Sequence, residues 1–419
     1  MRLRPIATDS PRRGEAGSLT PEDAERHFRE HRLGSGATPR RVGVEVEWLV
    51  HDMAAPQSPV PFDALTAAVE AAGTMPGGSR VTYEPGGQLE LSGPPGAGPA
   101  GACAAVAADL DVLRPALAGY GLAVAGIGLD PSRPPRRVVD SPRYRAMEAY
   151  FDVQGRAGRQ MMCSTAAIQV NVDAGPEPAV TWRVAHAVGA MLAATFANSP
   201  VLSGTSTGWR STRLTTWWAI DPSRTRPVGG TDPDAAWADY ARGARVMLLP
   251  GRDFAPVLEP LTFAEWMERG YRGVWPTASD LEYHLTTLFP PVRPRRWLEL
   301  RMIDGLPGPY WKVPVAIAAA LLEPDLTEAV TAAVAPTDGW WRTAARYGLS
   351  NPVLARAARR CFDLAEEVLS GGPDAELLPV VRSYRQRWVD RGRCPADDVL
   401  AAWNRNAHYP QEDEFACTT

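Results

Sequence analysis

The chain of 419 residues has few of the residues that build disulfide frameworks and zinc sites. Its five cysteines are scattered and odd in number, and no two of them have CxxC spacing. The six histidines form neither an HxH nor an HExxH motif, so both a disulfide scaffold and a zinc hydrolase signature are missing. Unpaired cysteines are typical of a reducing compartment, and we expect a cytoplasmic protein in which Cys163 is a small core residue and not a nucleophile.

Long apolar runs and an excess of charge of one sign are also missing. The longest apolar run, Val313–Leu322, has about 10 residues, whereas crossing a bilayer takes about 20. Residues 1–20 are basic and proline-rich, without the apolar stretch of a secretory signal. Forty-four basic residues against 48 acidic ones leave a net charge of −4, which provides no broad positive field. We therefore expect neither a membrane nor a nucleic acid as a partner.

Composition and turn signals favour one folded α+β domain between two tails. Hydrophobic residues make up 45% of the chain and charged residues 22%, as in soluble globular proteins. Thr20-Pro21 followed by two acids is typical of a helix start. We expect a flexible tail over residues 1–19, one domain over 20–409 that is helical from about 311, and a tail over 410–419; a split near residue 310 is the alternative. Further helices are expected near Gly101–Tyr120, Thr181–Ala197 and Ala396–Trp403.

Four segments alternate apolar and polar residues with a period of two, as strands with one buried face do. The first, Arg41–Trp48, has Glu45 and Glu47 on one face, about 6.5–7 Å apart along a strand, and valines on the other. The second, Val81–Ser92, has a Pro-Gly-Gly turn at its centre. Its polar residues are Glu84, Gln88, Glu90 and Ser92.

The third and fourth segments show the same alternation. In Ala167–Asp173, three apolar residues face one way and amides and an acid face the other. In Arg296–Met302 the apolar residues again share a face. The third segment carries Gln169, Asn171 and Asp173 opposite Ile168, Val170 and Val172, and the fourth carries Trp297, Glu299 and Arg301 opposite Leu298, Leu300 and Met302.

The polar residues of these segments point to a metal site. Any one segment alone is typical of a sheet with a solvated face, but five glutamates on one face repel one another strongly unless cations neutralise them. A ligand set made only of oxygen suits Mg²⁺ or Mn²⁺. Carboxylates that hold Mg²⁺ commonly handle a phosphate-bearing substrate such as ATP. The candidate metal ligands are Glu45, Glu47, Glu84, Glu90 and Glu299.

The ordered set of motifs resembles the plant-type glutamate–cysteine ligases, and in particular their shorter bacterial relatives that open ergothioneine biosynthesis. Residues Gly43–Glu47 are similar to the family's first-strand G-x-E-x-E, and the ten residues Glu84–Gly93 are similar to its EPGGQ-x-E-L-S-G. The resemblance covers roughly residues 42–312. It continues through Arg143-Tyr144, Gln169-Val170-Asn171, Phe196–Pro200, Arg213…Trp217, Arg224-Thr225 and Trp297–Arg301.

The resemblance implies a glutamine-synthetase-like α+β fold, with a curved antiparallel sheet, the active site on its concave face and helices packed behind. It also implies the reaction: ATP phosphorylates the γ-carboxylate of L-glutamate, and the amine of L-cysteine then displaces phosphate to give γ-glutamylcysteine. Mg²⁺, with Mn²⁺ as the alternative, is the implied cofactor, and ATP is a co-substrate. A monomer and a homodimer both stay open.

Roles carry over position by position from the resemblance. Arg301 and Glu84 are the candidate catalytic residues, with Arg301 steadying the transferred phosphate; its alternative role is an internal partner for Glu299. No thiol switch is carried over, because the cysteines match none of those in the plant enzymes.

Substrate and nucleotide residues follow in the same way. Arg213 matches an arginine that holds substrate glutamate, since a guanidinium suits bidentate capture of a carboxylate; its alternative is a surface salt bridge. Gln169 and Asn171 either bind substrate or pair within the sheet. Arg224 and Lys312 are the candidate nucleotide ligands, and Lys312, the one lysine of the chain, replaces an arginine of the plant pattern.

Two other functions are consistent with these motifs. One is a γ-glutamyl ligase of the same fold that uses another amine acceptor, because no motif identifies the acceptor pocket. The other is a non-catalytic sensor of nucleotide or metal. A screen of the products formed with a panel of amines distinguishes the first alternative from glutamate–cysteine ligation. The second alternative predicts binding of Mg·ATP without glutamate-dependent phosphate release.

Overall fold

The computed structural model describes residues 17–34 and 40–406, and a large antiparallel sheet organises them. Within these ranges the sheet has seven strands in the order β10-β11-β5-β1-β3-β2, and β4 pairs with the far end of β1. The predicted α+β class with an antiparallel sheet is confirmed. The strands are β1 (Val42–Asp52), β2 (Arg80–Tyr83), β3 (Leu89–Ser92), β4 (Leu122–Ala125), β5 (Ala167–Val172), β10 (Val292–Pro294) and β11 (Leu298–Asp304).

The four alternating segments become neighbouring strands, and their polar residues share one face. Cross-strand partners in an antiparallel pair lie on the same face. Glu45 lies opposite Gln169, and Glu47 lies opposite Glu90. On the other side of β5, Glu299 lies opposite Asn171. The period-two pattern therefore predicted correctly that separate strands contribute to a single polar face.

One residue of this pattern was placed wrongly. The register between β11 and β5 shifts between Leu300 and Ile303, so that Ile303 lies opposite Ile168 on the apolar face. Met302 does not take this position, and it lines a small cavity that Arg301 also lines. A β-bulge inserts an extra residue and re-aims the side chains around it, which a strict alternation cannot anticipate.

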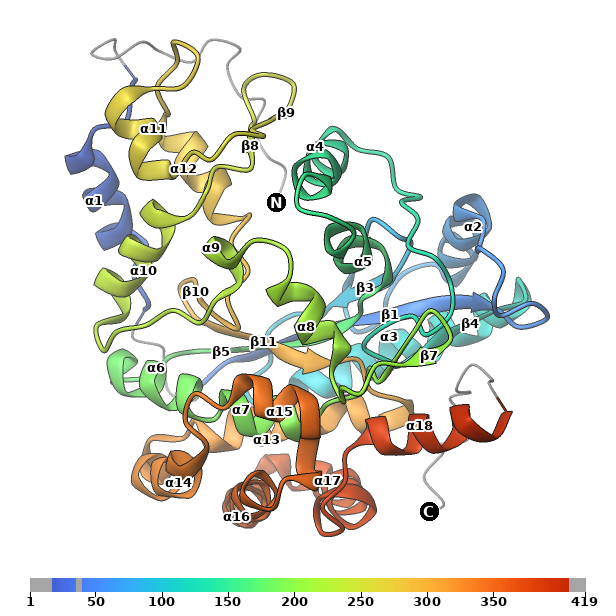
Figure 1. The fold of residues 1–419 in the computed structure, drawn as a ribbon. Helices are drawn as coiled ribbons and strands as arrows, with labels where there is room; N and C mark the ends of the chain where they lie inside the picture. Colours follow the sequence, from blue (N-terminus) through green and yellow to red (C-terminus); the bar gives the residue numbers. More distant parts are fainter. Residues whose placement is uncertain (1–16, 35–39, 407–419) are drawn as a thin grey trace.

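Helices cover the apolar face of the sheet (Figure 1). The valines of β1 and the leucines of β3 are almost completely buried against them, and each such side chain contributes about 1.5–3 kcal/mol. The C-terminal helices belong to this layer, since α13 packs on β5 and on α3. The helices of this side are α3 (Pro99–Gly119), α6 (Pro178–Ala187), α7 (Gly189–Thr195), α13 (Lys312–Leu321), α14 (Thr327–Val334), α15 (Trp341–Tyr347), α16 (Pro352–Ser370), α17 (Leu378–Tyr384) and α18 (Pro395–Asn406).

A second group of helices and one small hairpin stands over the polar face, above the sheet in Figure 1. Part of this layer has its own apolar cluster, which contains Met147, Phe151 and Met162 and is separate from the main core. The functional face thus lies between two packed layers. The elements of this group are α1 (Pro21–Glu30), α4 (Pro142–Asp152), α5 (Ala157–Ser164), α8 (Thr212–Trp218), α9 (Pro222–Thr225), α10 (Pro233–Gly243), α11 (Phe263–Arg269), α12 (Ala278–Leu285), β8 (Leu248–Leu249) and β9 (Ala255–Pro256). Outside this group, β6 (Val201–Leu202) and β7 (Thr205–Ser206) form a hairpin next to α18, and α2 (Phe62–Ala72) packs on α3.

The helix starts follow the capping chemistry of the sequence. Thr20 caps α1 in a capping box with Asp23, as the motif predicted. The helix expected over Thr181–Ala197 is two helices, and the second begins at Gly189, where an added Cβ would lie 2.2 Å from the ring of Trp341.

The ends of the predicted domain are described only in part. Within the predicted tail over 1–19, residues 17–19 are described, and Leu19 is buried with its N–H bonded to the carbonyl of Pro276. Residues 1–16 and the predicted tail 410–419 lie outside the described residues. None of the helices in the described part of the chain is long and apolar enough to cross a membrane.

Candidate functional site

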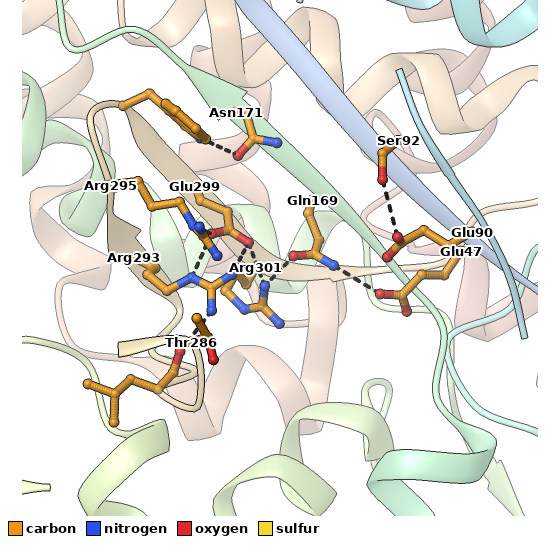
Figure 2. Close-up of polar contacts among 12 residues, drawn as sticks. Glu47, Glu90, Ser92, Gln169, Asn171, Thr286, Arg293, Arg295, Glu299 and Arg301 are labelled. Atoms are coloured by element: carbon orange, nitrogen blue, oxygen red, sulfur yellow. Dashed lines mark hydrogen bonds and ion pairs between the residues drawn. The ribbon is translucent and has the colours of Figure 1, made fainter. Parts of the chain in front are cut away.

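Three glutamates from neighbouring parts of the sheet form an acidic cluster. Glu47 comes from β1, Glu84 from the turn between β2 and β3, and Glu90 from β3. Each offers a carboxylate oxygen, and these oxygens all lie within 4.8 Å of one another. Figure 2 shows Glu47 and Glu90 side by side on the sheet. We call Glu47, Glu84 and Glu90 the acidic cluster.

The turn that carries Glu84 is fixed by close packing. The N–H of Glu84 bonds to the carbonyl of Gln88 at 2.9 Å, and Gly87 takes a φ of +86°, which favours glycine. A Cβ on Gly86 would lie 2.1 Å from the carbonyl oxygen of Cys163. The Pro-Gly-Gly sequence is therefore required for this turn to lie against α5, and the turn in turn places Glu84 beside the strand residues.

Burial and mutual repulsion raise the pKa values of Glu47 and Glu84, and that of the neighbouring Glu45. Burial is the main cause that raises the pKa of Glu47 to about 7, and the charge of Glu90 adds to it. The pKa of Glu84 lies well above its usual range, because it is buried beside Glu47 and Glu90. Glu45 has a pKa of about 7, raised first by burial and then by Glu299 and Glu90. A divalent cation would relieve this repulsion.

The donors around the acidic cluster fit Mg²⁺ or Mn²⁺. Within the described residues, the side-chain partners of Glu90 are the hydroxyls of Thr82, at 2.5 Å, and Ser92, at 3.2 Å. The cluster offers carboxylate oxygens and neither nitrogen nor sulfur, which is the ligand chemistry of hard divalent cations.

Beside the acidic cluster lies an arginine cluster, made of Arg293, Arg295 and Arg301 around Glu299 (Figure 2). Arg293 holds both oxygens of Glu299, at 2.6 and 2.7 Å. Burial disfavours the charged form of Glu299, but the guanidinium groups of Arg293 and Arg301 outweigh this effect and hold its pKa well below the usual range. The structure thus places Glu299 apart from the acidic cluster, with Glu45 adjoining both groups.

Gln169 connects the two clusters. Its Nε2 donates to Glu47 at 2.9 Å, and its Oε1 accepts from Arg301. Figure 2 shows this carboxamide between the glutamates and the arginines. Asn171 lies further along β5 and accepts from the indole N–H of the half-exposed Trp297 at 2.9 Å. Both predicted amides therefore lie on the functional face. Gln169 pairs with residues of neighbouring strands, and Asn171 pairs with Trp297 in the turn before β11.

Arg213 lies beside the arginine cluster and is almost completely buried. It lines a small cavity together with Arg301, Trp217 and Phe289. One nitrogen donates to the carbonyl of Arg301 at 3.0 Å, and another lies 3.6 Å from a carboxylate oxygen of Asp304. Its Nε has no hydrogen-bond partner in the described structure. Such a buried donor is available to a ligand carboxylate, and the surface salt bridge considered for Arg213 is excluded by its burial.

Two residues that hold this site together were not predicted from the sequence. Arg293 is the cross-strand partner of Glu299, and the run of arginines before Trp297 was a signal for it. Asp304 is buried and accepts from the hydroxyls of Ser199 at 2.7 Å and Ser211 at 3.0 Å. These bonds anchor the start of α8 next to Arg213, and the register shift in β11 hid this role.

Neither candidate nucleotide ligand, Arg224 or Lys312, lines the small cavity beside Arg301. Arg224 is fully buried and makes five hydrogen bonds inside the protein, including those to Asp221 and Thr287. It ties α9 to the segment before β10, and its nucleotide role stays a prediction. Lys312 is not brought to the site: it begins α13 behind the sheet and lines a different cavity with Trp311.

Comparisons with known proteins agree with this geometry. A model of the glutamate-cysteine ligase family 2 matches residues 41–416. The chain is 42% identical over 404 residues to the glutamate–cysteine ligase EgtA of Mycolicibacterium smegmatis, covering 93% of this chain and 94% of that protein. It is 30% identical over 361 residues to the chloroplastic glutamate–cysteine ligase of Arabidopsis thaliana, covering 79% and 67%. A solved glutamate–cysteine ligase from Francisella tularensis in complex with AMP has a TM-score of 0.53 at 13% identity, over 89% of this chain and 86% of that chain, and it supports the fold.

Proposed function

The chain belongs to the glutamate-cysteine ligase family 2, and from this premise we propose that it uses ATP to join the γ-carboxylate of L-glutamate to the amine of L-cysteine. The terminal phosphoryl group of ATP is transferred to the carboxylate, and the amine nitrogen then attacks the carbonyl carbon. Phosphate leaves, the amine loses a proton, and γ-glutamylcysteine forms. The observation that carries the proposal is that the acidic cluster and the arginine cluster lie side by side on one face. Gln169 hydrogen-bonds to Glu47 of the first and to Arg301 of the second.

The acidic cluster would hold Mg²⁺, with Mn²⁺ as the alternative. Its three carboxylates converge, and Glu45 and Glu299 extend the acidic face toward the arginines. Bound Mg²⁺ would offset the repulsion between the triphosphate of ATP and the carboxylate of glutamate. Glu45 and Glu299 would contribute to metal binding at the side of the acidic cluster that faces the arginine cluster; we call this the far side of the metal region.

Arg301 and Arg213 would bind different groups of the substrates. The contacts of Arg301 with Glu299 and Gln169 both use Nη1, so its other nitrogens are free among the described residues to steady the transferred phosphoryl group. Arg213 would hold a carboxylate of substrate glutamate. Trp217 and Phe289 pack against these guanidinium groups and exclude water from the acyl phosphate.

One assay tests the reaction. Phosphate release is measured with glutamate, cysteine and Mg·ATP, and each substrate is omitted in turn. The proposal requires release that depends on both amino acids. Release with glutamate and another amine in place of cysteine identifies a different acceptor, whereas ATP binding without glutamate-dependent release identifies a sensor.

We further propose, from the kinship with EgtA proteins, that the product enters ergothioneine biosynthesis.

Mg²⁺ should stabilise the protein more at pH 8 than at pH 6. Burial and repulsion raise the pKa values of Glu45 and Glu47 from the ordinary 4.5 to about 7, so Mg²⁺ displaces protons at pH 6 and meets ionised carboxylates at pH 8. In EDTA the folded state binds more protons than the unfolded state between pH 4.5 and about 7, so these two groups lower stability as the pH rises. The measurement is the rise in Tm with Mg²⁺ at each pH. Glu47→Gln is expected to flatten the dependence; an equal rise at both pH values contradicts the prediction.

Replacing Gln88 by leucine should weaken Mg²⁺ activation. The buried carboxamide accepts from the N–H of Gly86 at 3.0 Å and donates to the carbonyl of Thr165 at 2.9 Å, which holds the turn of Glu84 against the end of α5. Unpaired buried groups would cost about 1–3 kcal/mol. We expect the Mg²⁺ concentration for half-maximal activity to rise about tenfold. The control is the exposed Gln154→Leu; lower stability with unchanged Mg²⁺ activation would show that Gln88 supports only the fold.

A further inference from the structure

A second cavity lies on the side of the sheet that α3 and α13 cover. Its volume is about 470 Å³, and it lies between α3, β4 and the first turn of α13. This volume is in the range of small-molecule sites, about 300–1,000 Å³. Among the described residues that line it, none belongs to the acidic cluster or the arginine cluster. The cavity is therefore separate from the ligase site.

The lining combines apolar walls with a charged rim. Leucines of α3 and β4 form much of the wall, and an indole closes one side. Mostly apolar walls with a few charged groups are typical of a site for an organic molecule. The residues used here are the wall residues Leu117, Leu122 and Trp311 and the charged residues Asp111, Arg114 and Lys312.

Lys312 provides a positive charge to the rim of this cavity. Within the described residues it makes no ion pair with a carboxylate, and its ammonium lies 5.7 Å from the ring centre of Trp311. A single ammonium group matches a monoanion better than a dianion.

We propose that this cavity binds a small organic carboxylate with an apolar group, its charged end at Lys312 and its tail among the leucines. The position of the cavity also matters, because it lies where two strands of the ligase site end. Met53 follows β1 and Gly308 follows β11, and both line the cavity. A bound molecule would thus contact the chain directly beyond the strands that carry Glu47 and Arg301.

The single lysine permits a direct test on the whole protein. Reductive methylation with ¹³C-formaldehyde keeps the charge of an amine and labels Lys312 together with the N-terminal amine, because the chain has one lysine. Hexanoate is titrated without ATP or glutamate, at constant ionic strength. We expect a saturable shift of the Lys312 signal and none of the N-terminal signal. Absence of a saturable shift, or the same shift from chloride, overturns the proposal.

Two substitutions on α3 locate the binding. Ala118 is exposed and lines the cavity, whereas Ala104 is exposed on the same helix and does not. Ala118→Trp should weaken hexanoate binding about tenfold or more by occupying the cavity, and Ala104→Trp should leave it unchanged. Equal affinity in both variants, with Tm values that show folded protein, overturns the assignment to this cavity.

Two further measurements complete the test. Calorimetric titration of unmodified protein and Lys312→Gln with hexanoate removes any effect of methylation, and a weaker affinity in Lys312→Gln is expected. Phenyl phosphate tests the charged end, since it is largely a dianion above its second pKa of about 6. Tighter binding of phenyl phosphate than of hexanoate overturns the choice of a carboxylate.

Discussion

Replacing Glu90 by glutamine is expected to lower kcat/KM by about a thousandfold or more, at saturating Mg²⁺, without unfolding the protein. The substitution keeps the size of the side chain and an oxygen that accepts from Thr82 and Ser92. It removes one negative charge from the acidic cluster and changes half of the ligand oxygens of Glu90 to nitrogen. The measurement is glutamate- and cysteine-dependent phosphate release, with circular dichroism as the check on folding.

The matched control is Glu268→Gln, because Glu268 is exposed on α11. Glu299→Gln tests the far side of the metal region and should also abolish activity, but it leaves buried guanidinium groups uncompensated and is expected to destabilise the protein by about 3–5 kcal/mol. Turnover near that of the unmodified enzyme in both variants would rule out these glutamates as metal ligands.

Arg213→Lys is expected to raise the KM for glutamate about thirtyfold and the KM for ATP by less than about threefold. A lysine keeps the charge but cannot form two parallel hydrogen bonds with a carboxylate, and a hydrogen bond to a charged group is worth about 1.5–3 kcal/mol. The buried position of Arg213, with an unpaired Nε beside the small cavity, makes this loss specific to a ligand. Steady-state kinetics with each substrate varied in turn gives the two values.

The control for this substitution is Arg356→Lys, at an exposed position of α16. Equal rises in both KM values would assign Arg213 to the nucleotide or to the fold. A fall in kcat with unchanged KM values would instead indicate that Arg213 stabilises the transition state and not the bound substrate.

The sequence predicted the functional face well because alternation is a local property. Glu45, Glu47 and Glu90 share a face wherever their strands pair in register, and the apolar residues on the other face allow one register only. The EPGGQ turn was equally readable, since Gly86 allows the close contact with Cys163 and Gly87 takes the positive φ of the turn that carries Glu84.

The remaining errors have physical causes that no local pattern contains. We expected metal ions to balance the five glutamates, with Arg301 as an alternative partner of Glu299, but Arg293 and Arg295 also balance Glu299. Lys312 follows β11 closely in sequence, but the chain passes around the end of the sheet before α13 begins, so the lysine lies behind it. Proximity in sequence does not decide which side of a sheet a residue reaches.

The neutral carboxamide of Gln169 affects how the acidic cluster and Arg301 keep their charges available to substrates. A carboxylate at this position would pair with Arg301 and repel Glu47, and a cation would do the reverse. The neutral amide donates to Glu47 on one side and accepts from Arg301 on the other. It thereby separates two opposite charges that would otherwise form an ion pair. Both the anionic and the cationic half of the face thereby keep their charge for incoming ligands.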